Sequence, residues 1–186
     1  MKTKSLLFTL AILTFSAFQA QAQVDATLNT LGVLAGGTQL GVDFAINDEF
    51  SVEGTIGYNN NDDVSIIIDD ASTNYSSRGI PIQAVGKYYI GPAKGADKFY
   101  AAAFMRYVNR NYEQVGVEDP NTFTQSRFGI GFGLGTKLIS RSGVVFDFGM
   151  NLGRVISENV AVNETDVRLP RAIVGFKIGI GYRFGA

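Results

Sequence analysis

The stretch that decides the fold is VGFKIGIGYRF, residues 174–184. Successive side chains of a β-strand point to opposite faces, so one face here carries Val, Phe, Ile and Tyr, and the other carries Gly, Lys and Arg. This period of two predicts a β-strand with one apolar face and one small or polar face. Its 11 residues also suit a strand that crosses a membrane at a tilt.

The same alternation recurs in earlier segments of the chain. Six of them are clear, and their apolar faces lie within Leu40–Ile46, Phe50–Tyr58, Ile80–Ile90, Phe99–Tyr107, Phe128–Leu134 and Val144–Leu152. One more segment, within Ala26–Ala35, has apolar residues on both faces, so its register stays open. No window after Ala22 shows apolar residues sustained at helical spacing. The sequence therefore predicts eight strands and an all-β fold.

The predicted connections between these strands alternate in length. The short ones are Asn47–Glu49, Gly91–Asp97 and Ser140–Gly143. The long ones are polar and cover Asn59–Arg78, Asn109–Gln125 and Ser157–Val167, whereas the connection near Gly36 and Gly37 is brief. Such asymmetry is typical of a barrel inserted into a membrane from one side, with its long loops outside the cell. No linker or charge block divides residues 23–186, so we expect one barrel domain there.

Two barrels fit this pattern: a soluble one with the apolar face inward, and a membrane one with that face toward lipid. The chain has 22 Gly and only 18% charged residues, against about 25% charged in an average soluble domain. Its glycines cluster opposite the apolar faces, where they relieve crowding inside a narrow barrel but would make a poor water-facing surface. No charged residue falls on the apolar faces of the seven clear strands. We therefore predict an eight-stranded antiparallel up-and-down transmembrane β-barrel.

Residues 1–22 have the features of a cleaved export signal. Lys2 and Lys4 precede the apolar stretch Leu6–Phe18, and the small-x-small pattern Ala20-Gln21-Ala22 follows it. The stretch is interrupted by polar residues and is shorter than the roughly 20 apolar residues of a membrane-spanning helix. Cleavage would leave 14 basic and 17 acidic residues, a net charge of −3, which gives no reason to expect nucleic-acid binding.

The export signal, the eight segments, the loop asymmetry and the closing alternation of residues 176–184 resemble the small outer-membrane barrels of Gram-negative bacteria, of the OmpA/OmpX type. The resemblance extends from about Ala26 to Phe184 and is architectural. It implies a place in the bacterial outer membrane, surrounded by outer-membrane lipid and lipopolysaccharide. Enzymes among such barrels use a His as base, and this chain has neither His nor Cys. We therefore expect no catalytic residue, metal or cofactor.

Charged residues on the predicted inner face form the main candidate site. They are Asp43, Glu53, Lys87, Arg106, Arg127, Lys137, Asp147, Lys177 and Arg183. In one interpretation they pair with one another and fill a solid interior, because buried charges need partners and an eight-stranded barrel is narrow. In the other they line a thin pore that favours anions, because the set holds more bases than acids.

The long connection Asn59–Arg78 holds a second candidate site. Four acids surround a run of three Ile residues there, and these acids are Asp62, Asp63, Asp69 and Asp70. A solvated acidic loop is the simpler interpretation, since the spacing of the acids matches no calcium-binding loop. The run Ile66, Ile67 and Ile68 is apolar for an exposed loop. It either extends the hairpin above the membrane or contacts a partner protein.

These observations favour a non-enzymatic outer-membrane barrel with a structural or surface-interaction role through its long loops. A narrow anion-favouring pore and an accessory subunit of a larger outer-membrane complex are the alternatives. The partners expected are outer-membrane lipid, lipopolysaccharide and another envelope protein. The oligomeric state stays open at this stage.

Overall fold

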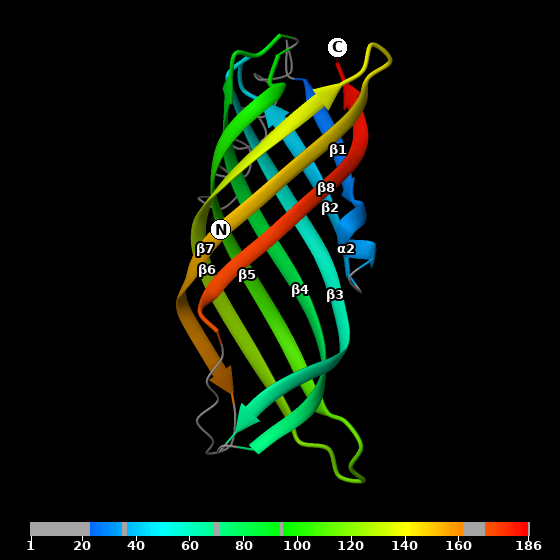
Figure 1. Cartoon of the computed structure of the whole chain (residues 1–186), viewed down its shortest axis with the longest axis vertical. Helices are drawn as coiled ribbons and strands as arrows, with labels where there is room; N and C mark the ends of the chain where they lie inside the picture. The colour runs from blue at the N-terminus through cyan, green and yellow to red at the C-terminus, as the bar shows by residue number, and fades with distance from the viewer. Residues whose placement is uncertain (1–22, 35–36, 69–70, 94, 162–169, 186) are drawn as a thin grey trace, which may run out of the picture.

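The computed structural model describes residues 23–34, 37–68, 71–93, 95–161 and 170–185. They form a closed barrel in which each strand pairs antiparallel with the next and the first pairs with the last (Figure 1). The strands are β1 (Val24–Asn29), β2 (Gly37–Ala45), β3 (Phe50–Ile68), β4 (Ala71–Ile90), β5 (Lys98–Gln114), β6 (Thr122–Ile139), β7 (Val144–Ala161) and β8 (Ala172–Phe184). The predicted eight-stranded fold is confirmed. The predicted export signal lies outside the described residues.

The apolar face of every clear strand points outward. Phe132, Leu134 and Phe176 are large apolar side chains, yet they are 76%, 62% and 60% exposed. The turns 46–49, 91–97 and 140–143 mark one end of the barrel, which we call the short-turn end. Near this end the rings of Phe50 and Tyr88 lie 4.9 Å apart. We call these outward apolar side chains the apolar belt. No helix in the described ranges is long and apolar enough to span a membrane.

The first strand is shorter than the sequence predicted. β1 ends at Asn29, and a short helix, α2 (Thr30–Leu34), follows it. The strand predicted within Ala26–Ala35 is therefore confirmed over Ala26–Asn29 and wrong over residues 30–34, and Ala35 lies outside the described residues. Side chains replace the backbone pairing at this point: Asn29 Oδ1 accepts a hydrogen bond from the Ile178 amide, and the Thr30 hydroxyl donates to the Ile178 carbonyl. The apolar residues on both faces of the segment thus belong to a strand and a helical turn.

The long connections are largely strand, which corrects their prediction as loops. β3 and β4 stay paired as far as Ile68 and Ala71, and β5 and β6 as far as Glu113 and Thr122. β7 likewise continues to Ala161, and residues 162–169 of the third connection lie outside the described part. The run Ile66–Ile68 is therefore part of a protruding hairpin, as one of its two interpretations held.

The predicted loops proved to be strand because the environment changes along each strand. On β5 and β6 the outward residues beyond the apolar belt are polar, such as Asn111, Glu113 and Thr124, so the hydrophobic alternation fades there although the backbone pairing continues. Inside this extension an aromatic cluster takes over, with Tyr75, Tyr112 and Phe123 each at most 6% exposed. The Phe123 ring lies 4.6 Å from the ring of Tyr112 and 5.4 Å from that of Tyr75.

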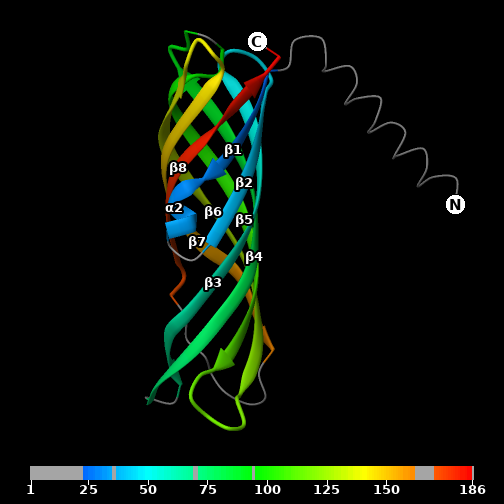
Figure 2. The same ribbon diagram turned by 90° about the vertical axis from the view of Figure 1, so that its right-hand side faces the viewer.

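The wall of the barrel is uneven in height. β2 last pairs with β3 at Gly37 and Asn59, and β7 last pairs with β8 at Arg154 and Ala172. Beyond these levels the wall consists of β3 to β7 alone, and we call this part the projecting sheet. Figure 2 shows α2 about half-way along the barrel, with β3 and β4 continuing well past it.

Candidate functional site: the charged interior of the barrel

Lys87 is the centre of an ion-pair network inside the barrel. Its Nζ lies 2.8 Å from Asp43 Oδ2, 2.7 Å from Glu53 Oε2 and 3.1 Å from Asp147 Oδ2. The Lys87 side chain is only 1% exposed, and those of its three partners are at most 3% exposed. A buried ammonium that has three carboxylates as partners can remain charged in this setting.

The network continues on both sides of Lys87. Lys137 Nζ lies 2.7 Å from Asp25 Oδ2 and 2.6 Å from Asp43 Oδ2, and the Arg183 guanidinium forms a two-pronged pair with Asp25 at 2.6 and 2.9 Å. Lys177 pairs with Glu53 and Asp147. The resulting set has four acids and four bases, and we call it the ion-pair plug: Asp25, Asp43, Glu53, Asp147, Lys87, Lys137, Lys177 and Arg183.

Two tyrosines pack around the plug. The Tyr100 hydroxyl donates to Asp147 Oδ1 at 2.8 Å, and Lys87 Nζ lies 4.9 Å from the centre of the Tyr100 ring. Lys137 Nζ lies 5.2 Å from the centre of the Tyr89 ring, which is 1% exposed. Aromatic faces over ammonium groups add attraction and fill space. The plug therefore has formal charges that balance and closely packed aromatic surroundings.

Glycines on β6 and β7 make room for aromatic rings in the interior. Gly135 pairs with Gly149 across the two strands, and a Cβ at Gly135 would overlap the Tyr100 ring. Four residues earlier on β6, Gly131 pairs with Gly153. A Cβ at Gly131 would lie 2.6 Å from the Phe104 ring, and a Cβ at Gly153 would lie 2.8 Å from it. Crowding relief, the reason the sequence suggested for the inward glycines, acts here on particular aromatic side chains.

We expect Gly135→Val to lower the free energy of unfolding by about 1–3 kcal/mol, the usual cost of overpacking a filled interior. The branched side chain would push Tyr100 away from Asp147 and disturb the plug. Unfolding by urea in detergent micelles, followed by gel electrophoresis of unboiled samples, measures the effect. Gly54→Val is the matched control, because its Cβ would meet no atom within 4 Å. Equal effects of both variants would contradict this packing argument.

The structure brings together seven of the nine predicted interior charges. Arg106 and Arg127 lie elsewhere, beyond the plug toward the projecting sheet, as described below. Sequence reasoning missed Asp25, because the predicted first strand began at Ala26 and its register was open, whereas β1 begins at Val24. The structure gives Asp25 its face, because Asp25 pairs in register with Asp43 and with Arg183, both on the predicted inner face.

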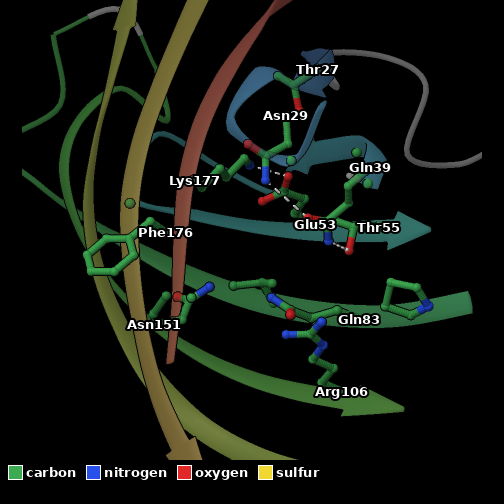
Figure 3. Close-up of a pocket in the computed structure, with 18 of the residues that line it drawn as sticks. Thr27, Asn29, Gln39, Glu53, Thr55, Gln83, Arg106, Asn151, Phe176 and Lys177 are labelled. Carbon is green, nitrogen blue, oxygen red and sulfur yellow. Dashed lines mark hydrogen bonds and ion pairs between the residues drawn. The ribbon is translucent and has the colours of Figure 1, made fainter. Parts of the chain in front are cut away.

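Arg106, Arg110 and Arg127 form a second charged group, which we call the arginine vestibule. They line a cavity of about 180 Å³ together with apolar residues that include Val108 and Ile173. Arg106 also lines a polar chamber of about 230 Å³ between the vestibule and the plug. Figure 3 shows Arg106 below Gln83 on the wall of this chamber, with Asn151 to one side.

Comparison with solved structures agrees with this architecture. The chain is similar to a major outer membrane protein from Thermus thermophilus, with a TM-score of 0.63 and 13% identity over 88% of this chain and 98% of that one. It is also similar to Ail of Yersinia pestis, with a TM-score of 0.48, 11% identity and coverage of 88% and 96%. Neisserial surface protein A gives a TM-score of 0.44, 15% identity and coverage of 89% and 96%.

At these identities the comparisons show the fold alone, and the Thermus protein carries that conclusion, since the other two TM-scores are below 0.5. The chain has the fold of an eight-stranded outer-membrane β-barrel, as its resemblance to the OmpA/OmpX type implied. No protein-family model matches the sequence, and no curated protein does.

Proposed function

We infer that this chain is a non-enzymatic integral outer-membrane protein that acts through its projecting sheet. The observation that carries this proposal is the length of the strands beyond the apolar belt. On β5 the outward face changes from Met105 and Tyr107 to Asn109, Asn111 and Glu113 while pairing with β6 continues. A barrel that served only as a membrane anchor would need no ordered wall past the lipid.

The projecting sheet offers two open strand edges for a partner. Among the described strands, β3 beyond Asn59 pairs only with β4, and β7 beyond Val155 pairs only with β6. Open edges accept an added strand through backbone hydrogen bonds. The run Ile66, Ile67 and Ile68 lies on the β3 edge. We therefore propose that another envelope protein contacts this edge. Lipopolysaccharide and outer-membrane lipid are the proposed surroundings of the belt.

The alternative of a narrow anion-favouring pore is less well supported. Lys87 and Lys137 are each 1% exposed within a plug of balanced charge. An ion could pass only if several of these pairs separated, and each separation would leave buried charge unpaired. We therefore expect no discrete conductance steps in planar bilayers.

Cysteine labelling of intact cells tests the proposal directly, because the chain has no Cys of its own. A membrane-impermeant maleimide should label Thr122→Cys on the projecting sheet in intact cells. It should label Arg141→Cys, in an exposed turn at the short-turn end, only after lysis. Phe132→Cys in the apolar belt should stay unlabelled in both conditions. Labelling of Phe132→Cys before detergent is added would overturn the transmembrane orientation.

A further inference from the structure

The arginine vestibule has an excess of positive charge that the ion-pair plug does not have. Arg127 Nε lies 3.5 Å from Glu158 Oε1, and the same guanidinium donates to the Pro170 carbonyl. Arg106 and Arg110 have no ion pair within the described part of the chain. Among the described residues, three guanidinium groups and one carboxylate therefore leave two positive charges in excess.

Hydrogen bonding shows the same imbalance. The Nε atoms of Arg106, Arg110 and Arg127 are all buried, and none has a hydrogen-bond partner among the described residues. Buried donors are nearly always satisfied in folded proteins, because an unmet donor has lost its hydration without replacement. Three such donors of the same type in one place point to a ligand that accepts from all of them.

The strand register explains why these side chains converge. Arg106 and Arg110 lie four residues apart on the inner face of β5, and Val108 stands between them. Val108 pairs in register with Arg127 on β6. Arg127 is therefore the diagonal neighbour of both other arginines, a spacing that long side chains bridge easily. Arg110 and Arg127 are also close enough to repel Arg106 electrostatically.

The cavity they line suits a compact anion. Its volume is about 180 Å³, and its other lining residues are small or apolar: Val108, Gly129, Val155, Ala172, Ile173 and Val174. No carboxylate is among them. Gly129 leaves room for the Ile173 side chain, which a Cβ at this position would overlap. A lining of arginines and apolar residues would repel a cation. The cavity is also many times larger than the space that one water needs.

Access is from the projecting sheet. Among the described strands, β8 begins only at Ala172 and β2 last pairs at Gly37, whereas β3 and β4 continue further (Figure 2), so the paired wall of the described part is lower on that side. The other direction is closed by the plug, whose Lys87 is 1% exposed. A ligand can thus enter and leave from one side without passing through.

We propose that Arg106, Arg110 and Arg127 form a binding site for a divalent tetrahedral oxyanion, a phosphate or sulfate group. Two negative charges on the ligand match the two excess positive charges, whereas a single carboxylate would leave one unmatched. Guanidinium groups donate in a planar fork that fits pairs of oxyanion oxygens. The group is either free phosphate or sulfate, or a phosphate monoester carried by a saccharide, because each of these presents two negative charges and oxygens that guanidinium groups can bind.

Titration calorimetry of the folded protein in detergent tests this site. The probes are inorganic phosphate, inorganic sulfate and glucose 1-phosphate, in chloride at constant ionic strength. We expect saturable binding with one ion per chain, and an increase in Kd of roughly tenfold or more in Arg106→Gln and in Arg110→Gln. Arg78→Gln, at an exposed outward position on β4, is the matched control and should bind as the unaltered chain does.

Comparison of the probes identifies the source of the group. Equal affinity for inorganic phosphate and glucose 1-phosphate indicates a free ion, and tighter binding of the ester indicates a group carried on a saccharide. Absence of saturable binding by all three probes, or unchanged binding in both vestibule variants, would overturn the proposal.

Stability provides an independent readout that a purely structural role would not give. In buffer free of phosphate and sulfate, Arg106→Gln should raise the midpoint of thermal unfolding, because it removes an uncompensated charge. The same variant should lose the stabilisation that added phosphate gives to the unaltered chain. A lower midpoint in both buffers would assign Arg106 to the framework of the barrel and contradict a ligand site.

Discussion

Lys87→Met is expected to lower the free energy of unfolding by about 3–5 kcal/mol, the cost of removing one partner from a buried ion pair. Met fills nearly the same unbranched space, so loss of packing is small. What changes is the charge: Asp43, Glu53 and Asp147 would remain buried after losing the ammonium 2.7 to 3.1 Å away. Lys137 and Lys177 can compensate only in part, because each already pairs with two acids.

Urea unfolding in micelles, with unboiled gel electrophoresis to separate folded from unfolded chains, measures this loss. Lys98→Met is the matched control, since Lys98 is exposed at the start of β5 and should tolerate the same change within about 0.5 kcal/mol. The double variant Lys87→Met with Asp147→Asn restores equal numbers of acids and bases, so it should recover part of the loss. A loss below about 1 kcal/mol for Lys87→Met would mean that the network is hydrated and not a plug.

The sequence predicted the architecture because membrane strands have a strong period of two. In residues 174–184 every second side chain faces lipid, and the structure confirms that Val174, Phe176 and Phe184 are exposed. The same signal disappears where the environment on the two sides becomes similar. Past the belt, water surrounds the outer face, so polar residues such as Asn109 and Asn111 occupy it and the segment looked like a loop. Its backbone is nonetheless paired strand.

The sequence predicted which charged residues face the barrel interior, but not how far along the barrel axis each one lies. Alternation places Arg127 and Lys137 on the same inner face, ten residues apart on one strand. Which acids they meet depends on the stagger between neighbouring strands, and no single-strand pattern contains that stagger. Lys137 meets Asp25 and Asp43 in the plug, whereas Arg127 meets Glu158 in the vestibule. Glu158 and Arg110 were missed because both fell in predicted loops.

Phe132→Arg provides the most direct test of which solvent surrounds the barrel. Phe132 is 76% exposed, lies between Ile130 and Leu134 on the outward face of β6, and pairs in register with Ala103 and Leu152. Its position is central in the apolar belt. Arg at the lipid midplane costs about 2–4 kcal/mol, so the variant should fold into lipid vesicles with that much less stability.

The control for this variant lies on the same face of the same strand. Thr122→Arg places an identical charge on the projecting sheet, opposite Glu113, where we expect a change within about 0.5 kcal/mol. Both variants are unfolded by urea in vesicles of one lipid composition, so hydrocarbon depth is the variable that differs between them. A water-soluble barrel would show the opposite order, because an exposed Phe replaced by Arg would improve its surface. Equal stability of the two variants would therefore contradict a lipid-facing belt and, with it, the transmembrane position of the plug.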